Sequence, residues 1–375
     1  MLGRRGSDGD AGPAPARAHA RPDAGAGQGA RLLGLATVVP PNALDQERVL
    51  LEAIDRFGLT AVQAAQCGAI FRNTGISCRY SARDFPWFRG SQDWASRSSA
   101  YLEGASDLFL RAAGAALAQS GIDPGAVDTV VTVSSTGIAT PSLEARVHGT
   151  LGLRPDVRRV PVFGLGCAGG ASGLSLATRL AAAEPGSTVL LVVVELCTLA
   201  FRSDAASKSN IVATALFGDG AAAAVVRAGD GAGGILQLER SGEHLWPDTL
   251  DVMGWDVDPV GFSAIFSKSI PDLVTERLRP AAEAFLAAGG RRLEEIEHYV
   301  FHPGGAKVVE ALERTFGLAQ GSLSCERDVL RRFGNMSAPT VLFVLERALA
   351  EMRGGPGLLV ALGPGFTASF VGFSA

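Results

Sequence analysis

The segment PVFGLGCAGGASGLSLATRLAAA, residues 161–183, contains the features that decide the fold. Its first residues are typical of the end of a strand, and its alanine- and leucine-rich part predicts a helix over 171–183. Glycines on both sides of Cys167 permit a sharp turn between these two elements. An apolar strand follows over 188–194, so Cys167 lies in a strand–turn–helix–strand unit typical of α/β proteins.

The elements expected around this unit recur in the second half of the chain. Before Cys167 we expect a strand from Arg31 to Val39, a mixed helical region to about Ala100, a helix over 105–120 and a β-branched strand over 127–133. In the second half we expect a helix over 270–288, a strand over 296–301, a helix opening at 333 and running through 350, and a strand over 357–361.

The spacing of the two halves supports an internal duplication. Cys167 lies 23 residues before Leu190, and Asn335 lies 23 residues before Leu358. Asn335 therefore occupies in the second half the place that Cys167 occupies in the first. A repeated supersecondary unit predicts two similar α/β halves packed together, whose central helices point their N-termini at one shared site.

Composition bounds the class of protein. A chain of 375 residues with 47% hydrophobic residues can bury a large core, and its formal net charge of −4 argues against a nucleic-acid-binding face. The longest apolar run, 189–194, is far shorter than the roughly 20 residues of a membrane helix. We expect a disordered tail over 1–30, unless the start codon is assigned too early, and two halves over 31–235 and 236–375.

The five cysteines form no CxxC pair and no zinc-type spacing with histidine. An odd number of cysteines spread over a long chain also does not suggest a disulfide framework. We therefore expect a protein of the reducing cytoplasm without a metal site.

Three residues predict the chemistry. Cys167 at a helix N-terminus is expected to favour the thiolate, which is the nucleophilic form. His302 follows a strand in YVFHPGG, where it can accept the thiol proton and donate to an oxyanion. Asn335 in FGNMS cannot titrate, so its expected role is to donate hydrogen bonds to a carbonyl or enolate oxygen. Such a set suits acyl transfer to water, as in cysteine proteases, or thioester condensation.

Four motifs decide between these alternatives. Their sequences are GCAGG from Gly166, ALFGDGAAA from Ala215, HPGG from His302 and GNMS from Gly334. In this order and spacing they resemble the motifs of type III polyketide synthases, the chalcone synthase-like enzymes of the thiolase fold. The resemblance covers about residues 31–375.

The resemblance implies a homodimer of five-layered αβαβα subunits that needs no acyl carrier protein, metal or redox cofactor. It implies that an acyl-CoA starter loads onto Cys167. Malonyl-CoA then decarboxylates beside His302 and Asn335, and the enolate attacks the thioester. Repetition and cyclisation give the product.

The resemblance also assigns roles around the cavity. Phe217 and Phe262 are expected to be gates between the coenzyme A tunnel and the cavity, and Glu195 to be a carboxylate that serves cavity water and cyclisation. The turn Gly363-Pro364-Gly365 corresponds to the family's GFGPG loop. This chain departs from that loop by having Ala361 and Leu362 in place of Gly and Phe, which affects the cyclisation scaffold.

The entrance of the coenzyme A tunnel is a second place where this chain departs from the family pattern. Plant relatives place basic residues on a helix where this chain has Gln66, Ala69 and Asn73. The substitutes we expect are Arg72, Arg79 and Lys307.

The starter is inferred from Ala200, which aligns with a pocket-lining Thr of chalcone synthases. Loss of the hydroxyl makes the wall more apolar, which favours a fatty acyl starter and an alkylpyrone or alkylresorcinol product. The alternative product is of chalcone or phloroglucinol type, from an aromatic or short starter.

Two other functions are compatible with the fold. A ketoacyl synthase III uses the same three residues but loads from a carrier protein, and we would expect an HQAN-like motif in place of HPGG. A catalytically silent, dimeric binding subunit is a different class, which the filled catalytic positions disfavour.

Overall fold

The computed structural model describes residues 29–204, 206–229 and 233–375. The tail predicted over 1–30 therefore lies outside the described residues, apart from its last two. Of these, Ala30 is fully buried and already belongs to the first strand, so the fold begins one residue earlier than expected.

The strands form one nine-stranded sheet in the order β11-β12-β13-β8-β1-β7-β6-β4-β5. Its two groups meet where Ala30–Leu32 of β1 pair with Leu236–Leu238 of β8. The first group comprises β1 (Ala30–Val38), β4 (Thr129–Val133), β5 (Arg158–Val162), β6 (Thr188–Leu196) and β7 (Asp219–Ala228). The second comprises β8 (Leu236–Leu245), β11 (His298–Phe301), β12 (Pro356–Gly363) and β13 (Thr367–Ser374).

The two groups share one topology. In the first group β4 and β6 are parallel, and β7 is antiparallel to both β6 and β1. In the second group β11 and β12 are parallel, and β13 is antiparallel to both β12 and β8. The predicted duplication is therefore confirmed, with β5 as an addition at the edge of the first group.

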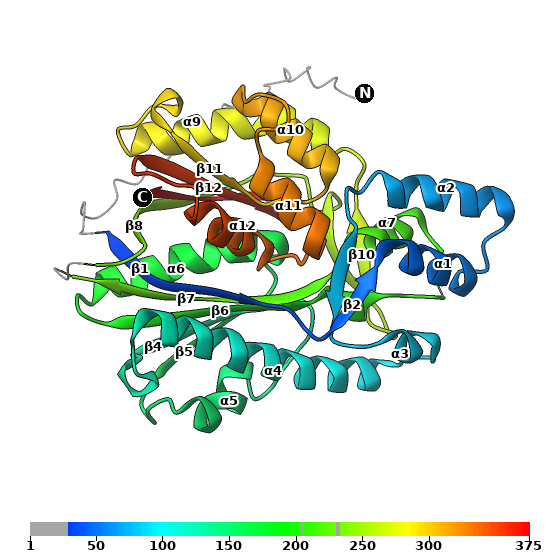
Figure 1. The fold of residues 1–375 in the computed structure, drawn as a ribbon, viewed down its shortest axis with the longest axis horizontal. Coiled ribbons are helices and arrows are strands. Elements are labelled where there is room, and N and C mark those ends of the chain that lie inside the picture. Colours follow the sequence, from blue (N-terminus) through cyan, green and yellow to red (C-terminus); the bar gives the residue numbers. More distant parts are fainter. Residues whose placement is uncertain (1–28, 205, 230–232) are drawn as a thin grey trace, which may run out of the picture.

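Figure 1 shows the five layers of the αβαβα fold that the sequence predicted. Helices α6 (Gly169–Ala183) and α12 (Thr340–Leu349) lie between the two strand groups. Helices α4 (Trp94–Ser120) and α5 (Leu143–Leu151) cover the outside of the first group. Helices α9 (Arg279–Ala288) and α10 (Ala306–Phe316) cover the outside of the second.

The central layer is packed by small residues. All nine residues of β6 are buried, as expected for a strand covered on both faces. Helix α6 approaches the start of α12 so closely that a Cβ added at Gly170 would lie 2.3 Å from the carbonyl oxygen of Ala338. A side chain at position 170 would therefore push the two central helices apart.

Two predicted helices have different limits. The helix predicted to open at 333 begins at Thr340, because Asn335 to Pro339 form a non-helical connection with Ser337 at a φ of 61°. The helix predicted over 270–288 consists of α8 (Ile270–Leu273), a π-helical turn over Val274–Leu278 and α9. Pro280 lacks the N–H that an α-helix would donate to the carbonyl of residue 276, which accounts for the local change of register.

The remaining elements gather at one end of the molecule, to the right in Figure 1. They are β2 (Asn42–Asp45), α1 (Gln46–Arg56), α2 (Ala61–Arg72), β3 (Cys78–Ser81), α3 (Phe85–Arg89), α7 (Lys208–Leu216), β9 (Met253–Val257) and β10 (Phe262–Phe266), with α11 (Ser324–Phe333) beside them. None of the helices in the described ranges is both long enough and apolar enough to cross a membrane.

Candidate active site

Cys167 lies in a single 3-10 turn, Gly166–Ala168, directly before α6. Gly166 has a φ of 47°, and a Cβ there would lie 2.6 Å from Cδ of Pro364. Only glycine therefore fits between the cysteine turn and the C-terminal hairpin. The Sγ atom of Cys167 lies 3.9 Å from Oδ1 of Asn335, so the structure brings together the two residues that the duplication relates.

Asn335 is fully buried and held by the backbone around it. Its Nδ2 donates to the carbonyl oxygen of Gly304 at 3.2 Å, and its Oδ1 accepts from the backbone N–H of Ser337 at 2.8 Å. The amide orientation is thereby fixed. One hydrogen of the amide nitrogen remains for a substrate oxygen.

His302 follows β11, and its backbone N–H donates to the carbonyl oxygen of Val360 on β12 at 2.9 Å. The side chain is only 4% exposed, and neither ring nitrogen has a hydrogen-bond partner among the described residues. The HPGG turn connects it to Asn335, since Gly304 accepts from the Asn335 amide and donates its N–H to the His302 carbonyl. A buried imidazole without a hydrogen-bond partner is unusual in a packed core, so the ring nitrogens of His302 are available to bind a substrate.

Burial shifts the pKa values of Cys167 and His302. It raises the pKa of the Cys167 thiol to about 11 and lowers the pKa of His302 to about 3, because a single charge is costly in the protein interior. Burial thus favours the neutral form of each group taken alone, and the thiolate expected from the helix N-terminus stays a prediction. Transfer of the thiol proton to the imidazole creates two opposite charges together, which attract each other strongly at low dielectric.

Phe217 follows α7 and forms a backbone bridge with Asn335. Its ring centroid lies 5.5 Å from that of Trp255 and 6.1 Å from that of Phe266. Phe262 packs against Trp94 and Trp255, so it reaches Phe217 only through Trp255. The sequence analysis missed Trp255 and Phe266, although the alternation of β10 places residues 262, 264 and 266 on one face.

Glu195 lies within β6, which extends two residues beyond the predicted strand, and is fully buried. Its carboxyl accepts from the N–H of Ser135 at 2.9 and 3.0 Å and from the Thr136 hydroxyl at 2.7 Å. Burial nevertheless raises its pKa to about 8. Ser135 also accepts from the N–H groups of Gly164 and Gly166, so it connects Glu195 to the turn that carries Cys167.

The predicted Gly363-Pro364-Gly365 turn is present between β12 and β13. Gly365 has a φ of 68°, and a Cβ at Gly363 would lie 2.6 Å from both the Leu165 carbonyl oxygen and Cβ of Ala168. The turn therefore packs directly against the segment that carries Cys167. Replacement of the preceding Gly and Phe by Ala361 and Leu362 leaves this contact intact.

The structure corrects one of the three proposed coenzyme A ligands. Arg79 is 1% exposed, and its guanidinium donates to Thr214 O at 2.6 Å, Phe217 O at 3.0 Å and Gln46 Oε1 at 2.6 Å. With both terminal nitrogens engaged inside the protein, it positions the Phe217 segment and does not bind a phosphate.

The other two proposed ligands stay predictions. Arg72 and Lys307 are exposed on neighbouring segments. Gly75, just after α2, and Ala306, at the start of α10, are close enough that a Cβ at Gly75 would lie 3.6 Å from Cβ of Ala306. Within residues 29–204, 206–229 and 233–375, no group of three or more His, Cys, Asp or Glu is placed to hold a metal ion.

A partly exposed Cys167 beside the buried Asn335 and His302, at the junction of two duplicated halves, is typical of an acyl-transferring enzyme of the thiolase-like fold. Residues 90–230 match the family model for the N-terminal domain of chalcone and stilbene synthases, and residues 237–372 match that for their C-terminal domain. The chain therefore belongs to the chalcone and stilbene synthase family, and it is a type III polyketide synthase that condenses acyl-CoA and malonyl-CoA.

Individual relatives agree with this assignment. A 1,3,6,8-tetrahydroxynaphthalene synthase of Streptomyces peucetius subsp. caesius is 36% identical over 351 residues, which cover 92% of this chain and 93% of the relative. A putative chalcone synthase of Bacillus subtilis (strain 168) is 33% identical, with 92% and 98% covered. The crystal structure of 1,3,6,8-tetrahydroxynaphthalene synthase from Streptomyces coelicolor A3(2) is similar with a TM-score of 0.86 at 28% identity, covering 92% of this chain and 99% of that one.

We predict that Cys167→Ala abolishes polyketide formation, because the variant lacks the thiol beside Asn335 that is proposed to hold the growing acyl group. Malonyl-CoA decarboxylation should continue, since His302 and Asn335 remain. Product mass spectrometry and release of carbon dioxide measure the two activities separately. Full polyketide output from the alanine variant would contradict the assignment.

We predict that His302→Ala and Asn335→Ala each slow malonyl-CoA decarboxylation by about a hundredfold or more, as expected for loss of an oxyanion donor. The effects should be less than additive in the double variant, because both groups act on one transition state. Decarboxylation at the parental rate by either single variant would show that its assigned role is wrong.

The raised pKa of Glu195 predicts that the stability of the folded protein depends on pH. Its pKa is about 8 in the folded protein against an ordinary value of 4.5, so between these pH values the folded state holds a proton that the unfolded state has lost. The protonated Glu195 therefore stabilises the folded protein fully below pH 4.5, and this stabilisation is lost as the pH rises towards 8.

Glu195→Gln removes this titration. We expect the melting temperature of the parent, relative to that of the variant, to fall by several degrees between pH 5 and pH 8. Burial also raises the pKa of Asp219 and Glu326, to about 6 and about 7, but both titrate in the two proteins alike. Parallel melting curves over the whole range would exclude an elevated pKa for Glu195.

Proposed function

We propose that this type III polyketide synthase takes a fatty acyl-CoA starter and releases an alkylpyrone or alkylresorcinol. The observation that carries the proposal is a mainly apolar pocket that has Ala200 in its wall and ends at Phe217. The space between the protein atoms in this pocket, open solvent included, is about 660 Å³.

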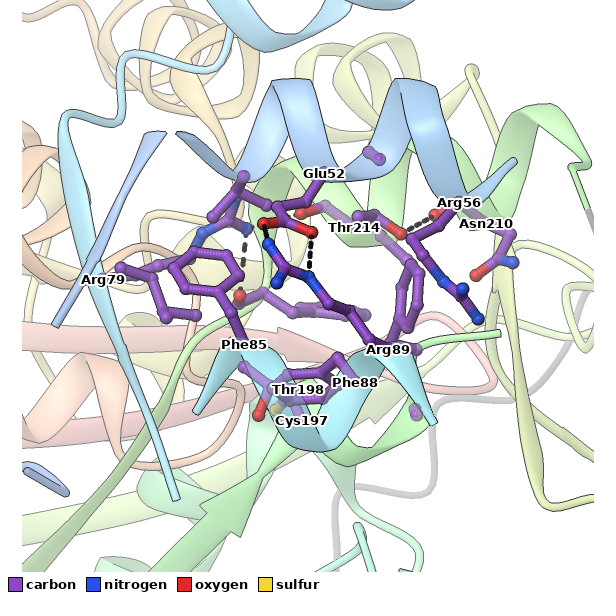
Figure 2. A pocket seen from close by; sticks show the side chains of 17 residues that line it. Glu52, Arg56, Arg79, Phe85, Phe88, Arg89, Cys197, Thr198, Asn210 and Thr214 are labelled. Atoms are coloured by element: carbon purple, nitrogen blue, oxygen red, sulfur yellow. Dashed lines mark hydrogen bonds and ion pairs between the residues drawn. The ribbon is translucent and has the colours of Figure 1, made fainter. Parts of the chain in front are cut away.

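The pocket, hereafter the starter pocket, is shown in Figure 2. Its apolar lining comes from β2, α1, α3, α7 and the segment after β6; these residues are Leu44, Val49, Ala53, Phe85, Phe88, Cys197, Ala200, Phe201, Ala213 and Phe217. Among the described residues of the lining, the only carboxylate is Glu52 and none is a tyrosine, while Thr198, Asn210 and Thr214 are the uncharged polar members. Each methylene buried here contributes about 0.8 kcal/mol to binding.

The starter pocket adjoins the catalytic residues at its inner end. Phe217, in the pocket wall, forms a backbone bridge with Asn335, and Cys197 lies close enough to Cys167 and Glu195 for their charges to raise the pKa of its thiol, which burial already raises. We propose that an acyl chain bound to Cys167 extends past Cys197 and Phe217 into the pocket.

We assign the catalytic steps to the residues that meet at this end. The Cys167 thiol gives its proton to His302 as sulfur attacks the starter thioester, and the proton leaves on the coenzyme A thiol. Malonyl-CoA then loses carbon dioxide while His302 and Asn335 donate hydrogen bonds to the enolate oxygen. The enolate carbon attacks the acyl group, and the Cys167 thiolate that leaves takes up one proton from solvent.

Several further properties form part of the proposal. We propose that the enzyme loads directly from coenzyme A esters, without a carrier protein, metal or redox cofactor, and acts in the cytoplasm. We also propose a homodimer. The proposed dimer surface lies at the edge strand β5. Beside this strand, the exposed side chains of Ile138 and Phe163 line a second cavity.

A second candidate product is a naphthalene-type aromatic, because one relative with 36% identity is a 1,3,6,8-tetrahydroxynaphthalene synthase. A naphthalene skeleton has ten carbons, which five two-carbon units supply without a long starter. The starter pocket would then have no acyl chain to hold. Product masses distinguish the two candidates directly.

We predict that kcat/KM for a fatty acyl-CoA exceeds that for 4-coumaroyl-CoA by about tenfold or more, because the Ala200 wall offers no partner for a phenol. Ala200→Trp fills the pocket and should shift the preferred acyl chain to shorter lengths. Ala319→Trp, on a loop that is not in the pocket wall, is the matched control.

A clear preference for the aromatic starter would reject the fatty acyl proposal while leaving the condensing mechanism intact. An unchanged acyl-length profile in Ala200→Trp would show that this wall does not contact the starter. Formation of a naphthalene product from malonyl-CoA alone would favour the second candidate.

A further inference from the structure

The short helix α3, Phe85–Arg89, covers the starter pocket, and none of its five residues is buried. Phe85, Phe88 and Arg89 nevertheless line the pocket. Figure 2 shows these side chains opposite α1, which carries Glu52. The helix thus forms one wall of the pocket, and its partly buried Phe85 and Trp87 pack against the edges of two hydrophobic clusters.

Few contacts attach α3 across the pocket. The Arg89 guanidinium pairs with Glu52 through two parallel bonds, of which Nε to Oε2 is 3.0 Å and the other joins Nη2 to Oε1. On the same side the Arg48 guanidinium lies 4.2 Å from the Phe85 ring centroid. On the other side the ring of Phe88 stands edge-on to Phe201, with 6.0 Å between centroids.

The Glu52–Arg89 pair lies in the path of a long acyl chain. Both side chains line the pocket, and their dashed contacts span it in Figure 2. The lining is mainly apolar, and this pair is a charged contact that joins α3 to α1 across it. In the proposed function, the methyl end of a long acyl chain held on Cys167 meets these two charged side chains.

We propose that the Glu52–Arg89 ion pair is a latch that sets the length of the acyl starter. This inference rests on the proposed function, because it requires the starter to occupy this pocket. With the latch closed, the pocket ends at the pair and admits chains of medium length. With the latch broken, α3 moves away from α1 and a longer chain extends into solvent.

The character of the pair suits a latch. Two parallel bonds between guanidinium and carboxylate fix a direction as well as a distance, so the closed position is well defined. The side chains are 56% and 19% exposed for Arg89 and Glu52, and ion pairs this exposed contribute little to stability. The latch can therefore be removed by mutation without unfolding α1 or α3.

The test measures starter loading separately from extension. Octanoyl-, dodecanoyl- and hexadecanoyl-CoA are incubated with the full chain without malonyl-CoA, and intact-protein mass spectrometry gives the acylation rate of Cys167. The variants are Arg89→Ala, Glu52→Ala and the charge exchange Glu52→Arg/Arg89→Glu. Arg111→Ala is the control, because Arg111 pairs with Asp107 on the surface of α4 and does not line the pocket.

We expect Arg89→Ala and Glu52→Ala each to raise the ratio of hexadecanoyl to octanoyl loading by about tenfold, as for the loss of a steric limit in an apolar pocket. The charge exchange should return the ratio towards the parental value, and Arg111→Ala should leave it unchanged. If fatty acyl groups load on Cys167 with the same dependence on chain length in all variants, the latch is wrong and the proposed starter class still stands. If no fatty acyl group loads on the parent or on Arg89→Ala, the proposed starter class and the latch are both wrong.

Discussion

The structure depends on the close approach of α6 to the start of α12 between the two strand groups. This contact requires glycine at position 170, because the carbonyl oxygen of Ala338 occupies the space that a Cβ would need. It brings the turn before α6 against the connection before α12, which places Cys167 Sγ 3.9 Å from Asn335 Oδ1. The two halves thus create the site only by packing together, and neither half contains it alone.

A site formed in the centre of a five-layered protein is largely desolvated, and this desolvation shifts the pKa values of its groups. The same burial raises the pKa of Cys167 and of Glu195 and lowers the pKa of His302. Each shift opposes an isolated charge, whereas a thiolate and an imidazolium formed together partly compensate each other. Burial therefore favours charges at this site that form as a pair over charges that stand alone.

The pocket proposed to select the starter lies in a different part of the molecule from the proposed catalytic residues. The catalytic residues are held by sheet and helix backbone, whereas the starter pocket is enclosed by short elements at one end, including α1, α3 and α7 (Figure 1). Because these elements contribute little to the main core, they can change without disturbing the catalytic geometry. A chain can therefore share the family's catalytic residues and differ from its relatives in the starter that it accepts.

The sequence by itself determined the fold class and the duplication and predicted Cys167, His302 and Asn335 as the catalytic residues, because strand and helix periodicity, turn glycines and motif spacing are local properties of the chain. Tertiary structure decided what depends on residues far apart in sequence. It placed Arg79 in the interior, although an arginine after a helix looks like a surface cation, because backbone carbonyls from the α7 segment fold over it. It also set the desolvation of the Cys167 thiol, which raises the pKa of that thiol and depends on segments far apart in the chain, and it joined Glu52 to Arg89 across a pocket whose walls come from five separate segments.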